Sequence, residues 1–137
     1  MGVGVVVFRG NHVLLAKRGK QPRRFTWSIP GGAQEINETI RDAAIREVRE
    51  ETGLEIKILG LVDVVDSINR DDNGRTQFHY TLVDFFAEWE SGKPVAGDDV
   101  VDVKWVPLEM LESYDLRQLT LDVIRLAAER RRAFGSS

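Results

Sequence analysis

A helix pattern between residues 39 and 53 constrains the fold of this chain more than any other stretch. Thr39 is a favoured N-cap residue, and Asp42 follows three positions later in the first turn. One side of the helix is apolar, with residues at four-residue spacing, namely Ile40, Ala44 and Val48. Gly53 favours the left-handed conformation that ends helices. The pattern predicts a helix that packs on a core and follows a loop opened by a Gly31-Gly32 turn.

Three glutamates share another side of this helix. Glu47, Glu50 and Glu51 stand at i, i+3 and i+4, so their side chains project side by side and their charges repel. A hard divalent cation such as Mg²⁺ would remove that repulsion, because it prefers carboxylate oxygens. A solvated acidic surface, tempered by Arg46 and Arg49, is the commoner explanation of such a run. The glutamates alone therefore leave both interpretations open.

The residues around these glutamates follow a longer pattern. Nine positions over 23 residues match it, and they are Gly32, Glu38, Arg46, Glu47, Val48, Glu50, Glu51, Gly53 and Leu54. A chance match at so many positions is improbable. The pattern resembles a complete Nudix box, and the preceding Trp27–Gly32 segment is similar to that of many Nudix hydrolases.

The resemblance implies an α/β fold, specifically the Nudix-type α/β/α sandwich, with a mixed sheet between the box helix and a C-terminal helix. It implies Mg²⁺-dependent hydrolysis, with Mn²⁺ as an alternative, of a nucleoside diphosphate linked to another moiety. The metal would neutralise the diphosphate and lower the pKa of a bound water.

The same resemblance suggests roles for individual residues. Glu47, Glu50 and Glu51 carry over as metal ligands and catalytic residues, with Glu47 at the position that commonly serves as ligand and base. The backbone carbonyl of Gly32 carries over as a further ligand. Glu38 is expected to support the metal site, and Arg46 to orient the glutamates through a salt bridge.

Composition narrows the class of protein. The chain has 137 residues, 42% of them hydrophobic and 30% charged, which suits one globular domain. A net charge of -3 argues against a general nucleic-acid binder. The chain has no cysteine, which excludes thiol chemistry and fits a cytoplasmic location. No apolar run reaches the length of a membrane span, and the first residues lack a signal-peptide pattern.

The remaining elements are predicted from β-branched runs, turns and helical spacing. The expected strands are 2–8, 13–18, 55–66, 76–89 and 100–106, with a short extended segment at 27–30. A short helical turn is expected at 107–111 and a closing helix at 116–134. The Asn73-Gly74 pair predicts a tight reversal whose tip could reach a substrate or a partner.

Four residues outside the box are candidates for substrate binding. Arg18 and Arg24 flank a basic loop and could clamp phosphate oxygens, although most such loops are only solvated surface. His79 is a possible pocket residue, because histidine titrates near neutrality, but a lone strand histidine is more often structural. Asp99, or its neighbour Asp98, could assist as ligand or base, since several Nudix enzymes have an acidic residue on a loop about here.

The substrate is less constrained than the reaction. The Arg18–Lys20 loop and the His79–Phe85 strand resemble small bacterial ADP-ribose pyrophosphatase-like members, so ADP-ribose or a related nucleoside diphosphate sugar is expected. A nucleoside triphosphate and a dinucleoside polyphosphate are the alternatives. A Nudix domain that senses a ligand without hydrolysing it is the alternative from another class. A homodimer is possible.

Overall fold

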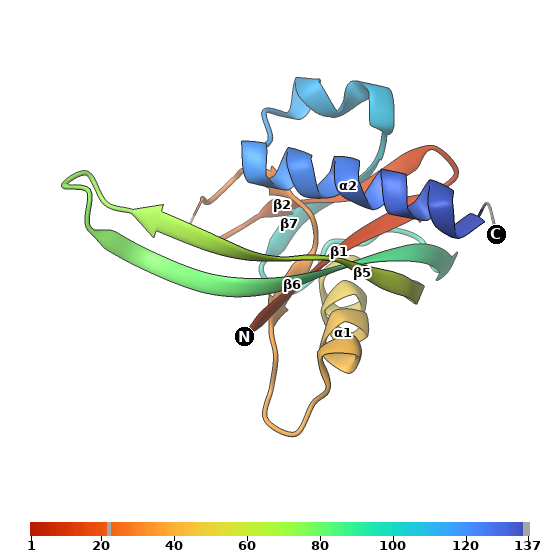
Figure 1. Ribbon diagram of the computed structural model, residues 1–137, viewed down its shortest axis with the longest axis horizontal. Coiled ribbons are helices and arrows are strands. Elements are labelled where there is room, and N and C mark those ends of the chain that lie inside the picture. The colour runs from red at the N-terminus through yellow and green to blue at the C-terminus, as the bar shows by residue number, and fades with distance from the viewer. Residues whose placement is uncertain (22, 136–137) are drawn as a thin grey trace.

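The structure is a computed structural model that describes residues 1–21 and 23–135, without the side chains of residues 69, 77 and 78. Within these residues seven strands form one sheet (Figure 1). They are β1 (Gly2–Arg9), β2 (His12–Arg18), β3 (Trp27–Ser28), β4 (Gly31–Ala33), β5 (Glu55–Arg70), β6 (Thr76–Ser91) and β7 (Val100–Pro107). The main path runs β3-β2-β1-β6-β5, while β4 pairs with β1 and β7 with β2. The sheet is mixed, because β1 and β6 are parallel and the other pairs are antiparallel.

Two α-helices cover opposite faces of this sheet, α1 (Ile40–Thr52) on one and α2 (Gln118–Gly135) on the other (Figure 1). A 3₁₀-helix, η1 (Leu108–Tyr114), precedes α2. The α/β/α sandwich expected from the sequence, with a mixed sheet between the box helix and the C-terminal helix, is thereby confirmed. Both ends of α1 are also as expected. Thr39 Oγ1 accepts a hydrogen bond of 3.1 Å from the Asp42 N–H, and Gly53 has a φ of 73°.

Strand β1 lies at the centre and is buried on both faces. Its side chains alternate between two apolar clusters, Val3, Val5 and Val7 toward α1 and Val6 and Phe8 toward α2. A strand with a helix on each face needs apolar residues at nearly every position, which explains the uninterrupted valine run.

Strands β1 and β2 separate soon after the turn that joins them. They pair only at Phe8↔Val13 and Arg9↔His12, and the first part of β1 pairs with β4 instead. The loop that enters the helix α1 is therefore held against the start of the central strand. This arrangement places the box next to the two glycines of β1, Gly2 and Gly4.

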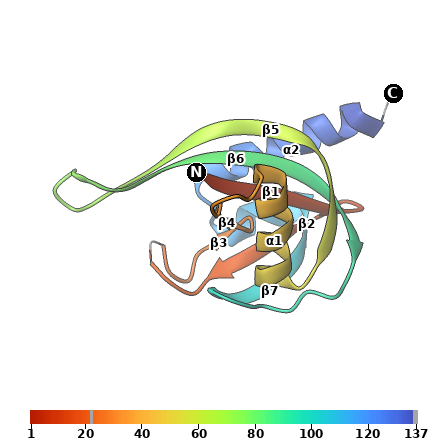
Figure 2. The same cartoon turned by 90° about the horizontal axis from the view of Figure 1, so that it is seen from below.

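The β5–β6 hairpin extends well beyond the body of the molecule (Figures 1 and 2). Its turn is closed by Asp71, whose side chain accepts hydrogen bonds from the N–H groups of Asn73 and Arg75. Gly74 adopts a φ of 77°, as the predicted reversal requires. The tip points away from the helix α1, so within this molecule it does not reach the box.

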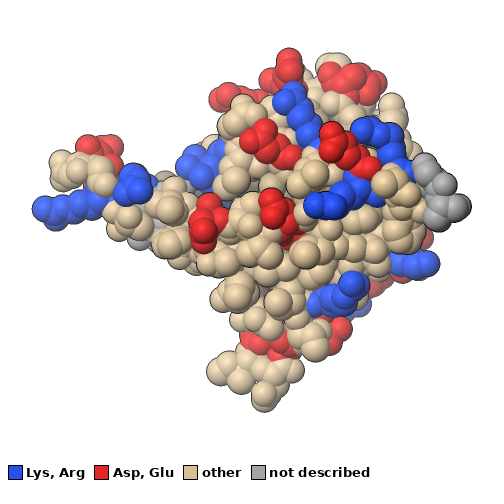
Figure 3. Space-filling model, in the orientation of Figure 1, with Lys and Arg blue, Asp and Glu red and all other residues tan. Residues whose placement is uncertain are grey.

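The charges over α2 and η1 are interspersed. Figure 3 shows acidic and basic side chains alternating on this face, without a large area of one sign. No described helix is long and apolar enough to cross a membrane.

The structure corrects the turn predicted at Gly31-Gly32. Both glycines belong to the strand β4, and neither is among the residues with positive φ. Both positions nevertheless lack room for a side chain. A Cβ on Gly31 would lie 2.1 Å from the Val3 carbonyl oxygen, and one on Gly32 would lie 2.4 Å from the Glu47 carboxylate carbon.

Candidate active site

Arg46 holds the acidic side chains of the box in place. Its Nε and Nη2 donate to the two oxygens of Glu38 at 2.7 and 3.0 Å, a forked arrangement suited to a carboxylate. Its Nη1 donates to Glu47 at 2.9 Å and Glu50 at 3.1 Å, while Nη2 also donates to the Ala33 carbonyl at 2.9 Å. Arg46 in turn lowers the pKa of Glu38. The guanidinium thus ties the loop before α1 to two glutamates of the helix.

Two of the three helix glutamates are buried together. Glu47 is 8% exposed and Glu51 9%, and the Gly31 N–H donates to Glu51 at 3.3 Å. Burial, followed by the hydrogen bond and the charge of Glu47, raises the pKa of Glu51 to about 8. Two buried carboxylates side by side cannot both ionise cheaply. A cation bound beside the pair would offset this repulsion and favour the ionised form of Glu51.

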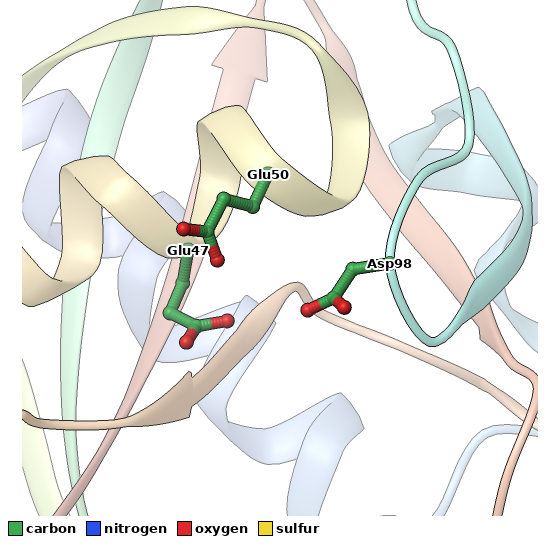
Figure 4. A group of neighbouring side chains, drawn as sticks. All are labelled: Glu47, Glu50 and Asp98. Carbon is green, nitrogen blue, oxygen red and sulfur yellow. The ribbon is translucent and has the colours of Figure 1, made fainter.

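A carboxylate from a distant segment of the chain joins those of Glu47 and Glu50. Asp98, on the loop before β7, points toward Glu47 and Glu50 (Figure 4), and carboxylate oxygens of the three residues lie within 4.8 Å of one another. The loop is anchored to the end of α1, because the N–H groups of Val95 and Gly97 donate to the carbonyls of Thr52 and Glu51. A partly exposed set of hard oxygen donors fits a divalent cation such as Mg²⁺ or Mn²⁺.

A cavity of about 680 Å³ joins this group to the other face of the sheet. On the side of α1 it is lined by Gly31, Gly32, Glu47, Glu51, Asp98 and Asp99. On the side of α2 it is lined by Val65, Ser67, Tyr80, Leu82, Asp84 and Arg117. Its volume is in the range of sites for whole small molecules, and its two sides differ in chemistry.

The family match covers nearly the whole chain. The NUDIX domain family matches residues 1–127, which include the box and the strands around it.

The chain belongs to the NUDIX domain family.

Relatives agree in sequence and in structure. The chain is 32% identical over 127 residues to an ADP-ribose pyrophosphatase of Methanocaldococcus jannaschii, which covers 91% of this chain and 73% of that protein. It is similar to a crystal structure of a MutT NUDIX hydrolase from Burkholderia pseudomallei, with 30% identity, a TM-score of 0.72, and coverage of 93% and 94%. It is also similar to the NUDIX domain of Shewanella oneidensis NrtR complexed with ADP ribose, with 26% identity, a TM-score of 0.75, and coverage of 94% and 86%. This Nudix protein is therefore a hydrolase acting on pyrophosphate bonds.

The predicted site residues of the Nudix box are brought together in part. Glu47 and Glu50 face Asp98, whereas Glu51 lies beside Glu47 and contacts β4 through Gly31. Gly32 lies against the Glu47 carboxylate, so its role as a ligand through the carbonyl stays a prediction.

The candidates outside the box divide into two groups. Arg18 and Asp99 line the cavity, and Asp99 forms an ion pair of 2.6 Å with Lys20. Arg24 and His79 do not line it: Arg24 stacks over the exposed Phe25 ring, and His79 lies 3.4 Å from Asp66 on the projecting hairpin. Pro22, in the predicted basic loop, lies outside the described residues.

Several lining residues were missed from the sequence. Arg117, at the start of α2, donates to the Ser67 hydroxyl at 3.1 Å, and Arg23 lines the same cavity. Asp84 carried a signal that could have been used, because it is a charged residue inside the apolar run 82–87. Arg117 carried no such signal in the sequence, because arginines that precede a helix are common on protein surfaces.

Proposed function

We propose that this Nudix hydrolase cleaves ADP-ribose or a related nucleoside diphosphate sugar, with Mg²⁺ or Mn²⁺ as the cofactor. The observation that carries the proposal is the set of residues that line the cavity. The cavity begins at clustered carboxylates suited to a metal-bound diphosphate and continues past β1 to a side lined by aliphatic, aromatic and hydrogen-bonding residues. Such a site has room for a diphosphate and an attached nucleoside together. The ADP-ribose pyrophosphatase relative and the neighbour complexed with ADP ribose support this substrate class.

In the proposed reaction, water adds to one phosphorus and the bond from that phosphorus to the bridging oxygen breaks. One proton of the attacking water passes to a carboxylate of the acidic group. The bridging oxygen leaves on the other phosphate with the electron pair of the broken bond, and two phosphomonoesters result. Glu47, Glu50 and Asp98 would hold the cation, which would neutralise the diphosphate and lower the pKa of water in its coordination sphere. Glu51, beside Glu47, completes the acidic group, and Arg46 keeps these carboxylates in position. Arg18 lines the cavity near Glu51, where its charge can bind a phosphate oxygen.

The test is product analysis over a panel of metabolites, with and without Mg²⁺. The panel contains ADP-ribose, NADH, UDP-sugars, dGTP and its oxidised form, and diadenosine tetraphosphate. We expect AMP and ribose 5-phosphate from ADP-ribose, with the highest kcat/KM of the panel and no turnover without a divalent cation.

Two outcomes would contradict the proposal. Release of pyrophosphate from a nucleoside triphosphate at a higher kcat/KM would assign the protein to nucleotide sanitising. No turnover of any compound, together with a rise in Tm on adding ADP-ribose, would indicate a ligand-sensing domain instead.

A further inference from the structure

Asp84 is a buried charge that the proposed reaction does not use. It lies in the middle of β6 and is 2% exposed. Its Oδ1 atom is buried and has no hydrogen-bond partner among the described residues. Burial, together with the negative charge of Asp63 on β5, raises the pKa of Asp84 to about 6. An unpaired buried carboxylate costs folding free energy, so its presence calls for a reason beyond stability.

The neighbouring strand leaves space for this side chain. Asp84 pairs with Gly4 of β1, and a Cβ added to Gly4 would lie only 2.3 Å from Asp84 Oδ1. An alanine at position 4 would therefore displace the carboxyl group. Because Gly4 has no Cβ, the carboxyl group of Asp84 can lie over the backbone of the central strand β1. Gly4 and Asp84 both line the cavity, and together they form part of its floor.

The surroundings of Asp84 differ from those of the metal-binding carboxylates. Even-numbered residues of β6 point toward α2, so Asp84 shares a face with Leu82 and Tyr80, whereas α1 and its glutamates lie on the other face. Val65 adds a further apolar side chain, and Ser67 is held by Arg117. An acceptor on an apolar floor favours a flat, partly apolar group that presents N–H or O–H donors.

We propose that Asp84 determines specificity by accepting a hydrogen bond from the nucleoside part of the substrate. The donor is either the amino group of the base or the 2′-hydroxyl of the attached ribose, and both offer the same chemistry to a carboxylate. This inference rests on the proposed function in one respect, namely that the substrate is a nucleoside diphosphate derivative. A site built around a buried acceptor rejects an analogue that lacks the donor, because the acceptor then stays unpaired.

The test combines one substitution with two substrate analogues. Wild type and Asp84→Asn are compared on ADP-ribose, on its analogue with hydrogen in place of the adenine amino group, and on its analogue without the 2′-hydroxyl of adenosine. We expect Asp84→Asn to lower kcat/KM for ADP-ribose by about 10- to 100-fold, the effect of a hydrogen bond to a charged group. We expect wild type to lose a similar factor with one analogue. Asp84→Asn should lose clearly less with that same analogue, because its neutral amide oxygen accepts a weaker hydrogen bond than a carboxylate does.

Which analogue behaves in this way identifies the donor. The inference is overturned if Asp84→Asn keeps kcat/KM for ADP-ribose within about twofold, or if each analogue lowers kcat/KM equally in both proteins. It is also overturned if the variant loses activity with a Tm below wild type, because removal of a buried charge should raise Tm. Asp66→Asn, which changes an exposed carboxylate of the projecting hairpin that does not line the cavity, is the matched control and should keep its activity.

The two proposals can fail separately. If the panel identifies another nucleotide as the substrate, ADP-ribose is abandoned and the same comparison is made with that nucleotide and its two corresponding analogues. Coupling between Asp84 and one donor would then uphold the role of Asp84 although the substrate assignment had failed. Hydrolysis of ADP-ribose without such coupling would uphold the substrate and overturn the role of Asp84.

Discussion

The three glutamates at the end of the box helix differ in their surroundings. Glu47 and Glu51 are buried, whereas Glu50 is exposed and shares Arg46 with Glu47. The sequence places them on one side of a helix but does not show which of them face the protein. Burial gives Glu47 and Glu51 the low dielectric in which a charge acts strongly on a substrate.

At the scale of single residues, we predict that Glu51→Gln lowers kcat by about two orders of magnitude or more, as expected for loss of a charge-stabilising group in an active site. The fold should be retained, since glutamine has nearly the same shape and can still accept from the Gly31 N–H. Steady-state kinetics at saturating Mg²⁺ and circular dichroism measure the two effects. Glu90→Gln, which changes an exposed glutamate of β6 that does not line the cavity, is the control. A near-wild-type rate for Glu51→Gln would refute the assignment.

Asp84 yields a prediction about stability. Its pKa is raised from 3.8 to about 6 in the folded protein, so the folded state binds the proton more tightly than the unfolded state. The contribution of Asp84 to the free energy of unfolding therefore falls as the pH rises from about 4 to above 6. The total loss is roughly 2–3 kcal/mol. Asp84→Asn should remove this loss, so its gain in Tm over wild type should be larger at pH 8 than at pH 4. Calorimetry across this range is the measurement, and an equal difference at both pH values would contradict it.

At the scale of elements, the helix α1 and the strand β4 meet at two adjacent glycines with different neighbours. A Cβ on Gly31 would meet backbone, the Val3 carbonyl, whereas one on Gly32 would meet the side chain of Glu47. Backbone of a central strand cannot move aside easily, but a carboxylate can be displaced.

We therefore expect Gly31→Ala to lower stability, by about 1–3 kcal/mol as in other overpacked sites. Gly32→Ala should keep most of the stability but lower kcat, because it pushes Glu47 away from Asp98. Thermal unfolding and kinetics on both variants separate these effects. Gly135→Ala, with nothing within 4 Å of the added Cβ, is the control. Equal losses of Tm in Gly31→Ala and Gly32→Ala would contradict the assignment of Gly31 to stability and of Gly32 to catalysis.

The same helix allows a comparison of two arginines. Arg46 makes forked contacts to the box glutamates, whereas Arg49 makes its forked contact to the partly exposed Glu55, outside the box. Lysine keeps the charge but not the planar fork. Arg46→Lys should raise the Mg²⁺ concentration needed for half-maximal activity by about 10-fold or more, as for other residues that orient metal ligands. Arg49→Lys should leave it unchanged, and a similar effect of both variants would show that only net charge matters.

At the scale of the whole molecule, the metal site joins segments far apart in the chain. Asp98 reaches Glu47 and Glu50 because the loop before β7 is hydrogen-bonded to the end of α1. Asp99, its neighbour in sequence, instead pairs with Lys20 on the loop after β2. Adjacent acids thus serve different parts of the cavity.

This difference can be measured through ligand-linked stability, since a cation that binds only the folded state raises Tm. We expect Mg²⁺ to raise the Tm of wild type and of Asp99→Asn by similar amounts. Asp98→Asn should show a clearly smaller rise, because it removes a ligand. A full Mg²⁺ effect in Asp98→Asn, or its loss in Asp99→Asn instead, would show that the wrong acid was assigned.

The sequence by itself determined the helix of the box, both of its caps and the adjacency of its glutamates. These features depend on contacts between residues three or four apart, which any α-helix provides. The resemblance to the Nudix family also predicted the α/β/α sandwich and the type of bond that is hydrolysed. The strands were also predictable, because their apolar runs are long and their turns carry Gly and Asn.

Only the tertiary structure decided which distant residues meet. It turned Gly31 and Gly32 into a strand, because pairing with β1 outweighs the local preference of glycine for turns. It selected Asp98 rather than Asp99 to face the glutamates, left Arg24 and His79 away from the cavity, and placed Asp84 on its floor. Each of these outcomes depends on strand register and on the packing of segments far apart in sequence, which local patterns do not encode.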